Sequence, residues 1–412
     1  MRLLRNAIRP YAWGSRTAIA ELMGRQAPAD HPEAELWMGA HPGDPSSLTG
    51  EDGGERTLIE VIEEDPASQL GPELATRWSN RLPFLLKVLA AEEPLSMQAH
   101  PSAEQAAEGY AREEELGIPR DAPTRNYPDA TPKPELVCGL TEFHVLAGFA
   151  PADRTVALLR ALDAPEAPAL AGHAGLLAGQ QDSDGLRALF TTWITLPQQH
   201  LDDLLPAVVK ACAAHADADG EFALQCRTAL ALAEEHPGDA GVLASLLMNR
   251  ITLQPGEALF LPAGNLHLYL NGLAVEALAN SDNVLRGGLT PKHVDVPELL
   301  RVLDFSCRDM PVLRGEPEPG QPRLRVYRTG SPEFELSRLD WPAGDGGAAA
   351  EVDLRGGRPQ ILLCTEGSAA VRGDREVTVP RGQSVWLPAS EPAVSVWPAG
   401  DGPVQVFRAT TG

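Results

Sequence analysis

The sequence predicts a mainly β fold with one α-helical insertion. Short apolar runs bounded by Pro and Gly fill residues 80–150 and return after Ile251, which is the pattern of strands joined by turns. Residues 151–245 are dominated by Ala and Leu instead, which is typical of short helices. Residues 251–263 also align without gaps with residues 377–389, so a β unit is repeated within the chain.

The composition limits the class of protein. The chain has 412 residues, of which 43% are hydrophobic, and a formal net charge of −23. This length indicates roughly two to three domains of about 100–200 residues each. An acidic chain is not expected to bind nucleic acid or anionic membranes, because both need a basic face. Only four basic residues are Lys, and each is a candidate for a site that needs a compact ammonium: Lys87, Lys133, Lys210 and Lys292.

Targeting signals and cysteine usage indicate a cytoplasmic protein. Residues 1–13 contain three Arg and no apolar core of a secretory signal. The chain has no apolar run of the roughly 18 residues that would indicate a membrane span. Its five cysteines are widely spaced without a C-x-x-C motif, which favours reduced thiols over a disulfide or zinc-thiolate framework.

Two helical segments can be placed from their patterns. The polar stretch 104–115 predicts a helix between the first strands. Four residues of the insertion fall at the i, i+3, i+4, i+7 spacing of one helix face, namely Leu201, Leu204, Leu205 and Val208. Pro206 lies within this face, so we expect the helix to be kinked or to restart there.

The repeat predicts two similar β units. Each copy reads as a strand, a turn at Gly256 or Gly382, and a strand that ends in Leu-Pro. Short antiparallel strands of this kind build a cupin-like or jelly-roll-like β-barrel. We therefore expect two such barrels plus a helical domain. The first barrel would be discontinuous, and the three domains would comprise residues 1–150 with 246–305, residues 151–245, and residues 306–412.

The two copies differ where chemistry is expected. His267 near the first copy corresponds to Ala393 near the second. A metal or catalytic site is therefore expected in the first barrel. The C-terminal barrel is expected to lack metal ligands and to have a structural or oligomerising role.

The stretch SMQAHP at 96–101 supplies the first candidate site residues. On a strand, Ser96, Gln98 and His100 project from the same face. Folding the chain back at residues 91 and 92 would bring Lys87 opposite Ser96. A Gln-x-His pair alone is more often part of a surface or a satisfied core than of a metal site.

A second candidate lies around Asn271 and Gly272. An Asn-Gly pair between apolar runs predicts a two-residue hairpin turn, which would place His267 opposite Glu276. An imidazole and a carboxylate on a mostly apolar hairpin are costly to bury without a role. The alternative is an ordinary His–Glu hydrogen bond at the mouth of a barrel.

Two further segments carry charge. Prolines flank Lys133 and precede Glu135, which stiffens an extended segment. Arg286 and Lys292 border a glycine-rich turn and would form a basic site suited to an anionic group such as phosphate. Taken alone, each segment is better explained as a loop with solvated charges.

The segments are more specific in combination. One amide oxygen, two imidazole nitrogens and one carboxylate suit zinc or another divalent ion with room for water, and they come from Gln98, His100, Glu135 and His267. No thiolate belongs to this set, so a closed structural zinc site is not expected.

These segments resemble the type I phosphomannose isomerases. The matching stretches, besides His267 and Glu276, are YAWG at 11–14, ELWMGAHP at 35–42, PFLLK at 83–87, SMQAHP at 96–101, KPE at 133–135 and ANSDNVLRGGLTPK at 279–292. The resemblance covers about 1–150 and 245–305. It implies a zinc-dependent enzyme with one Zn²⁺ per chain that interconverts mannose 6-phosphate and fructose 6-phosphate through an enediol.

The resemblance also implies roles for individual residues. It implies that Gln98, His100, Glu135 and His267 bind zinc and that Arg286 is the catalytic arginine. Substrate contacts are expected from Ser96, Lys87, Lys133, Lys292 and Asp282. We take Glu276 as the base that moves the carbon-bound proton, with Lys133 and Asp282 as the other candidates.

Other functions remain to be compared with this one. A cupin metal oxygenase would want a redox ion and several imidazoles, whereas one ligand here is Gln. A non-enzymatic bicupin carbohydrate-binding protein would not need the lysines and Arg286 to converge. For the isomerase we expect a small sugar phosphate as the partner, no nucleic acid or membrane, and a monomer or weak homodimer.

Overall fold

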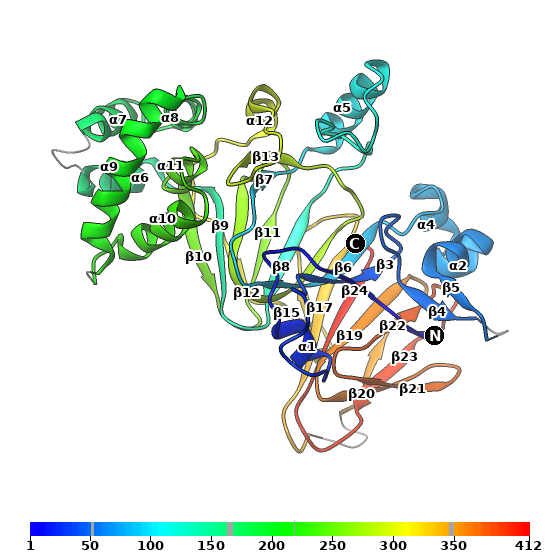
Figure 1. Ribbon diagram of the computed structural model, residues 1–412. Coiled ribbons are helices and arrows are strands. Elements are labelled where there is room, and N and C mark those ends of the chain that lie inside the picture. The colour runs from blue at the N-terminus through cyan, green and yellow to red at the C-terminus, as the bar shows by residue number, and fades with distance from the viewer. Residues whose placement is uncertain (51–52, 163–167, 218, 346–349) are drawn as a thin grey trace.

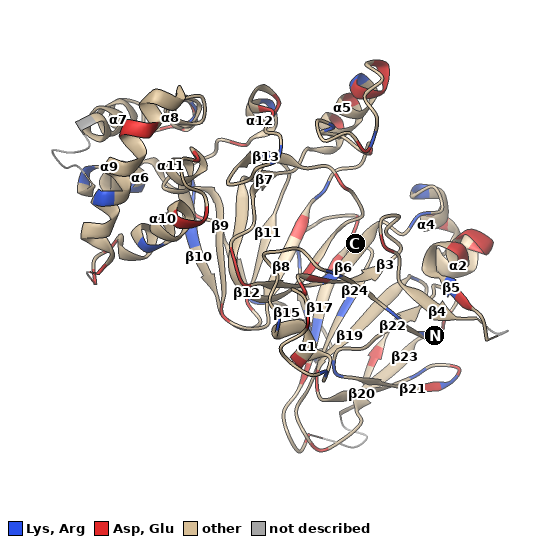
Figure 2. Ribbon diagram, viewed as in Figure 1, with Lys and Arg blue, Asp and Glu red and all other residues tan. Residues whose placement is uncertain are grey.

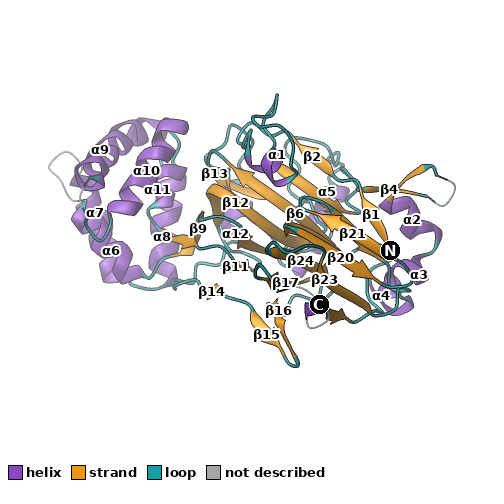
Figure 3. Ribbon diagram, turned by 90° about the horizontal axis from the view of Figure 1, so that it is seen from below, coloured by secondary structure: helices purple, strands orange, loops and turns teal. Residues whose placement is uncertain are grey.

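The protein is mostly antiparallel β-sheet with a helical region at one end, as the sequence predicts (Figure 1). The computed structural model describes residues 1–50, 53–162, 168–217, 219–345 and 350–412. Within them, the two largest sheets have 11 and 7 strands. Seen from below, the helical region lies beside the sheets rather than over them (Figure 3).

The 11-stranded sheet is formed by the first two-thirds of the chain. Its main path contains β2 (Ala7–Arg9), β3 (Glu35–Gly39), β6 (Phe84–Ala91), β8 (Glu135–Gly139), β11 (Ala258–Leu261), β12 (His267–Ala279) and β14 (Val312–Leu313). Attached to this path are β7 (Met97–Ala99), β9 (Phe143–Phe149), β10 (Met248–Leu253) and β13 (Leu285–Gly288). The long strand β12 connects the two groups, because it pairs with β6 and β8 and also with β7 and β9.

The predicted hairpin at Asn271 and Gly272 is wrong. The chain runs straight through both residues, so His267 and Glu276 lie on one continuous strand and do not face each other. Asn271 pairs with His144, and Gly272 pairs with Ala91. A two-residue turn needs a positive φ at both positions, but only Gly272 has one, at 121°. A register shift after Tyr269 accommodates the irregularity.

The C-terminal part of the chain forms a 7-stranded and a 4-stranded sheet. The first consists of β1 (Arg2–Leu4), β22 (Ser384–Leu387), β19 (Gln360–Glu366), β24 (Val404–Thr410), β17 (Glu335–Trp341), β16 (Gln321–Tyr327) and β15 (Glu316–Glu318). The second consists of β18 (Val352–Leu354), β23 (Val394–Pro398), β20 (Ser368–Arg372) and β21 (Glu376–Pro380). A further pair is β4 (Ser47–Thr49) with β5 (Glu55–Thr57). Strand β1 therefore belongs to a sheet whose other strands all come from the C-terminal part of the chain.

Both copies of the repeat have the predicted local structure. Strands β10 and β11 flank Gly256, whose φ is 82°, and β21 and β22 flank Gly382, whose φ is 77°. Beyond the repeat, the strand pairing shows that the two copies correspond with a shift of one residue from the gapless alignment. Val145 and Val371 occupy equivalent positions in the two copies. Tyr269 pairs with Val145 and Val396 pairs with Val371, so Tyr269 is equivalent to Val396. Counting back two residues places Val394, rather than Ala393, at the position of His267.

The helical region contains the leucine face that the sequence predicts. Its helices are α6 (Ala152–Ala161), α7 (Pro168–Gly179), α8 (Ser183–Ile194), α9 (Gln198–Ala216), α10 (Ala223–Glu235) and α11 (Gly241–Ser245). All four residues of the predicted face on α9 are buried. The helix continues through Pro206 without a break, so the predicted restart is wrong.

Six further helices lie outside this helical region in the described part of the chain. They are α1 (Ala18–Leu22), α2 (Leu58–Glu64), α3 (Pro66–Leu70), α4 (Pro72–Arg77), α5 (Ala103–Glu115) and α12 (Val296–Val302). The predicted helix at 104–115 is confirmed as α5. Ser102 and Gln105 form reciprocal capping hydrogen bonds at its start. Acidic residues gather on the peripheral helices α2 and α5 (Figure 2). Among the described helices, none is long and apolar enough to cross a membrane.

Candidate metal centre and active site

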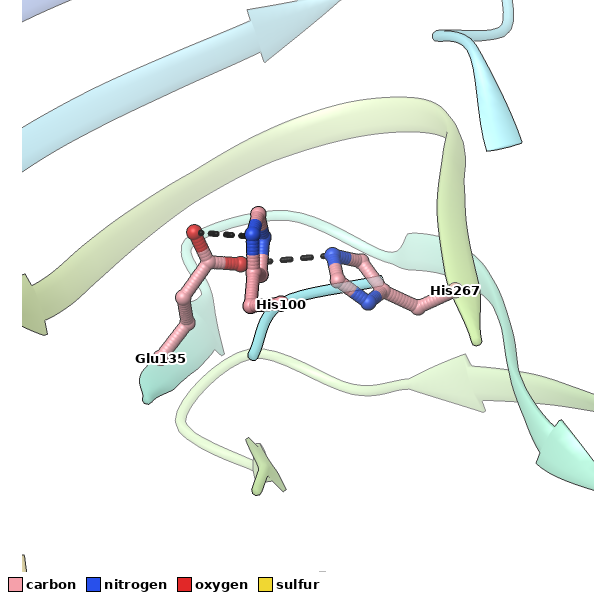
Figure 4. A group of neighbouring side chains, drawn as sticks. All are labelled: His100, Glu135 and His267. Carbon is pink, nitrogen blue, oxygen red and sulfur yellow. Dashed lines mark ion pairs between the residues drawn. The ribbon is translucent and has the colours of Figure 1, made fainter. Parts of the chain in front are cut away.

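Three predicted ligands converge at one point of the 11-stranded sheet (Figure 4). His100 follows β7, Glu135 begins β8 and His267 begins β12. Their ligand atoms all lie within 4.8 Å of one another. Each side chain is almost fully buried, with at most 2% of its residue surface exposed. The sheet thus brings together residues that are far apart in the sequence.

Backbone carbonyls fix the tautomer of both imidazoles. His100 Nδ1 lies 2.7 Å from the carbonyl oxygen of Asn283, and His267 Nδ1 lies 3.0 Å from that of Asn265. A carbonyl oxygen can only accept, so each Nδ1 carries the proton and each Nε2 keeps its lone pair. Sequence reasoning missed both supporting residues, although Asn283 lies within a stretch that matched the family.

The remaining ligand atoms have no hydrogen-bond partner. Each Nε2 lies 3.3 Å from an oxygen of Glu135. Even so, His100 Nε2, His267 Nε2 and Glu135 Oε2 are buried without a hydrogen bond among the described residues. Buried polar atoms that lack partners and point toward one another are costly unless something binds them. Two imidazole lone pairs and a carboxylate fit a zinc ion.

Charge at this centre suits a cation. Burial lowers the pKa of His100 to about 4, so its imidazole is neutral at pH 7. Burial acts to raise the pKa of Glu135, but His100 and Lys133 outweigh it and hold that pKa well below its usual value. Lys133 Nζ lies 3.2 Å from Glu135. The centre therefore presents an ionised carboxylate and a neutral imidazole.

The strand register places two further predicted residues beside the centre. Gln98 of β7 pairs with His267 on one side and with Arg286 of β13 on the other. Directly paired residues project from the same face of a sheet, so these three side chains share one face. Arg286 is half-buried, and no carboxylate in the described part of the chain lies within ion-pair distance of it. Its guanidinium thus has charge to offer a ligand.

Lys87 is placed differently from the prediction. Strand β6 pairs with β3 and β12, not with β7, so the predicted pairing of Lys87 with Ser96 is wrong. Lys87 Nζ lies instead 3.7 Å from Glu35 and 3.6 Å from Glu276. It is buried and stacks over the ring of Trp37. Burial acts to lower the pKa of Lys87, but the two carboxylates outweigh burial and raise it.

Glu276 lies in the same buried row as Lys87. Tyr269 donates a hydrogen bond of 2.7 Å to its carboxylate. Burial, reinforced by the charge of Glu135, raises the pKa of Glu276 to about 7, although Lys87 acts to lower it. At neutral pH Glu276 is therefore partly protonated, whereas Glu135, the carboxylate of the metal centre, is ionised.

The other predicted residues lie nearer the surface. Asp282 is exposed and pairs with His41 at 3.3 Å, and this pairing lowers the pKa of Asp282. Lys292 is exposed and Ser96 is half-buried. His41 belongs to the matching stretch 35–42 but carried no predicted role. The carboxylate of Asp129, which sequence reasoning missed, accepts hydrogen bonds from Ser281 and from the backbone N–H of Asp282.

Comparisons with known proteins agree along the whole chain. A family model described as phosphomannose isomerase type I, catalytic domain, matches residues 1–152. The chain is 37% identical over 397 residues to a mannose-6-phosphate isomerase of Escherichia coli (strain K12), covering 96% of this chain and 97% of the relative. It is 33% identical over 414 residues to a mannose-6-phosphate isomerase of Homo sapiens, covering 93% of this chain and 92% of the relative.

Solved structures give the same result. A mutant phosphomannose isomerase from Salmonella typhimurium matches with a TM-score of 0.88 and 34% identity, covering 100% of this chain and 99% of that chain. A zinc-bound mannose 6-phosphate isomerase matches with a TM-score of 0.87 and 35% identity over the same shares. With this extent of similarity in sequence and structure, the chain belongs to the type I phosphomannose isomerases.

Proposed function

We propose that this protein is a mannose-6-phosphate isomerase, which interconverts mannose 6-phosphate and fructose 6-phosphate with one zinc ion per chain. The observation that carries the proposal is the buried group of His100, Glu135 and His267, whose ligand atoms lack hydrogen-bond partners. The similarity to the mannose-6-phosphate isomerases of E. coli and Homo sapiens supports it, and so does the similarity to a zinc-bound mannose 6-phosphate isomerase. Gln98 is proposed as the fourth ligand, because it shares a sheet face with His267.

The reaction moves a proton between C1 and C2 of the sugar. It needs a base, stabilisation of the charge that develops on oxygen, and an anchor for the phosphate. A zinc ion held by this centre supplies Lewis-acid polarisation of a sugar oxygen. Arg286 adds positive charge on the same face, since its half-buried guanidinium is not engaged by a carboxylate in the described residues.

Glu276 is the proposed base. A general base works best when its pKa lies near the working pH, and the pKa of Glu276 is about 7. Lys87 and Tyr269 hold its carboxylate in place. Asp282 is the weaker candidate because its pairing with His41 lowers its pKa, and Lys133 is engaged by Glu135. Glu276 and His267 lie on one continuous strand rather than on opposite strands of a hairpin, so the proposal depends on this pKa and these contacts.

The phosphate is proposed to bind to cations at and beyond the edge of the buried centre, of which Lys133 contacts Glu135 and Lys292 is exposed. Lys292 is exposed on the segment that follows β13, and Lys133 precedes β8. Together with Arg286 they are proposed to form a basic region in a chain of net charge −23. Ser96 and Asp282 are proposed to contact the sugar. Lys87 is proposed to act through Glu276, since its ammonium is already engaged by two carboxylates.

An isomerase assay with mannose 6-phosphate tests the metal requirement. Complete removal of metal by a chelator is expected to abolish turnover, and adding zinc back is expected to restore it. Full activity of the metal-free protein would overturn the proposed mechanism. Oxygen-dependent turnover with iron would favour an oxygenase instead.

Two variants test the residue roles. Arg286→Ala is expected to lower kcat by roughly 10²–10³-fold with zinc still bound, because it removes one stabilising charge; loss of zinc would make Arg286 structural. Glu276→Gln is expected to lower kcat without loss of zinc. Normal turnover in Glu276→Gln together with a large loss in Asp282→Asn would move the base to Asp282.

The finer organisation is also proposed. We infer two cupin-like halves, with the domain limits 1–150 plus 246–305, 151–245 and 306–412. Helices α6 to α11 support the helical insertion. Strand β1 pairs with β22, so the proposed first domain contributes a strand to the C-terminal sheet. A cytoplasmic location and a monomer or weak homodimer remain predictions.

A further inference from the structure

A second polar cavity lies between the C-terminal strands. It has a volume of about 290 Å³, and its charged lining comprises four arginines, Arg328, Arg355, Arg358 and Arg408, and three carboxylates, Glu318, Glu335 and Asp353. Four arginines around one cavity are unusual in a chain of net charge −23. None of them belongs to the metal centre described above.

The repeat places this cavity at the position equivalent to the metal centre. Leu261 of the first copy corresponds to Leu387 of the second, 126 residues later. Leu261 pairs with Glu135, and Leu387 pairs with Gln360. Gln360 therefore takes the position of the ligand Glu135, and it accepts a hydrogen bond from Arg408, which lines the cavity.

The other ligands are replaced in the same way. Since Val394 stands in for His267, its partner Leu354 stands in for Gln98. Gly356, two residues further on, stands in for His100, and both Leu354 and Gly356 line the cavity. An amide, two apolar side chains and a glycine cannot hold zinc. The cavity has been kept while the metal ligands are missing.

Arg408 takes the place of the proposed base. Glu276 pairs with Val137, which lies two residues after Glu135. Arg408 pairs with Leu362, which lies two residues after Gln360, the equivalent of Glu135. The C-terminal cavity therefore has a fixed positive charge where the first half has a carboxylate. The two sites are matched in position but opposite in charge.

The guanidinium of Arg408 is buried but only partly engaged. Its Nε donates a hydrogen bond of 2.6 Å to Gln360, and its Nη1 lies 3.6 Å from Glu335, which is too far for a hydrogen bond. No other hydrogen bond from this side chain exists among the described residues. Only 9% of Arg408 is exposed, and burial lowers its pKa. Its two terminal nitrogens therefore have hydrogen-bonding capacity to offer an anion, although Nη1 is within ion-pair distance of Glu335.

Two further arginines leave positive charge unpaired. Arg328 is neutralised by Glu316 and Glu318. Arg358 donates hydrogen bonds to an oxygen of Thr411 and to an oxygen of Gly412, and within the described residues neither Arg355 nor Arg358 pairs with an Asp or Glu side chain. Several guanidinium groups with spare donors match the charge and the oxygen geometry of a phosphate group better than those of a single carboxylate.

We propose that this C-terminal cavity binds a phosphate group, either free or carried by a small sugar, at a site separate from the metal centre. Its volume of about 290 Å³ is at the lower end of the range for small-molecule sites. Arg408 contacts the phosphate from the floor of the cavity, and Arg355 and Arg358 contact it from the rim.

Calorimetric titration of the zinc-loaded, full-length protein tests this proposal. Inorganic phosphate and fructose 6-phosphate are titrated separately into the wild type, Arg286→Ala and the double variant Arg355→Gln/Arg358→Gln. Arg286→Ala is expected to retain binding at the C-terminal cavity. The double variant is expected to weaken that binding by roughly tenfold or more, since it removes charge-assisted hydrogen bonds, with kcat unchanged.

Controls separate the possible outcomes. Arg325→Gln is the matched control, because Arg325 is exposed on β16 but does not line the cavity. Arg408→Gln tests the floor directly, and the exposed double variant decides the result if Arg408→Gln does not fold. Binding of inorganic phosphate alone assigns the site to the free ion, and binding of fructose 6-phosphate alone assigns it to a sugar phosphate. Loss of all binding in Arg286→Ala, or equal binding by the double variant and Arg325→Gln, overturns the proposal.

Discussion

At the scale of single residues, the metal centre depends on where two protons sit. The carbonyl groups of Asn265 and Asn283 hold the protons of His267 and His100 on Nδ1. This leaves both Nε2 lone pairs directed at Glu135 before any ion binds. Metal binding therefore needs no tautomer change and little rearrangement, which favours affinity.

Glu135→Gln tests the centre directly. The amide retains the shape of the carboxylate but removes its negative charge and one oxygen ligand, so we expect less than a tenth of the wild-type zinc content and a matching loss of isomerase activity. Metal analysis of the purified variant measures this. Glu142→Gln is the control, because Glu142 is exposed and lies beside His144 rather than a ligand. Wild-type zinc content in Glu135→Gln would contradict the assignment.

Lys87→Met tests the buried charge row. Removing the ammonium leaves Glu35 and Glu276 without their cation in a buried site, and breaking a buried pair in this way costs about 3–5 kcal/mol. Urea unfolding should therefore show a stability loss of that size. Lys210→Met on the exposed side of α9 should change the free energy of unfolding by less than about 1 kcal/mol. Equal stability of the two variants would mean that the row does not stabilise the fold.

At the scale of elements, the sequence predicted features that depend on neighbouring residues better than it predicted which strands pair. The helix at 104–115, the leucine face of α9 and both glycine turns of the repeat depend on nearby residues, and each is confirmed. The Asn271-Gly272 turn was wrong because β6 and β9 supply partners on both sides of that dipeptide. Tertiary pairing of this kind overrides a local turn preference and is not visible in the sequence.

Glu298→Gln tests how α12 is held against α5. Arg112 lies 3.0 Å from Glu298 and Arg301 lies 2.6 Å from it. Burial acts to raise the pKa of Glu298, but hydrogen bonds from Arg301, Tyr127 and Arg112 lower it from 4.5 to about 2. Because the folded-state pKa is depressed, this stabilisation is complete above the unfolded value and is lost as the pH falls to about 2.

The expected loss of stability in Glu298→Gln is about 1–3 kcal/mol at pH 7. The difference from the wild type should shrink as the pH falls from about 4.5 toward 2. Urea unfolding at several pH values measures it. Glu115→Gln, at the exposed end of α5, should be nearly neutral. A difference that stays constant with pH would show that the charge of Glu298 is not the cause.

At the scale of the whole molecule, the two halves share one core. A single hydrophobic cluster contains Leu36 and Leu86 of the first sheet together with Leu336, Ile361 and Phe407 of the C-terminal sheet. Burial of apolar surface is the main contribution to stability. Neither half can therefore separate without exposing this cluster to water.

Zinc should accordingly stabilise strands far from its ligands. At a free concentration 100 times its Kd, zinc stabilises a cooperative fold by about 2.7 kcal/mol. Hydrogen exchange should then slow equally in peptides from β10 and β11 and in peptides from β22 and β24. Slowing confined to the first group would mean that the halves unfold separately. The same exchange measured on Glu135→Gln with zinc is the control.

The site could be predicted because each part has its own local motif. Gln98, His100, Glu135 and His267 were chosen from short stretches and from the family resemblance, and three of them converge in the structure. The carbonyl groups of Asn265 and Asn283 could not be predicted, since a backbone oxygen has no sequence signature. The C-terminal cavity also escaped sequence reasoning. Arg408 and Gln360 are 48 residues apart and meet only through the pairing of β19 with β24.

The position of β1 has a consequence for protein synthesis. Arg2 pairs with Trp386, so almost the whole chain separates the two partners. Ribosomes add about 5–20 residues per second, and a chain of this length takes on the order of 20–80 s to make. For most of that time the first strand has no partner. The nascent protein can therefore complete its C-terminal sheet only once β22 has been made, and until then the unpaired β1 is a segment that chaperones can bind.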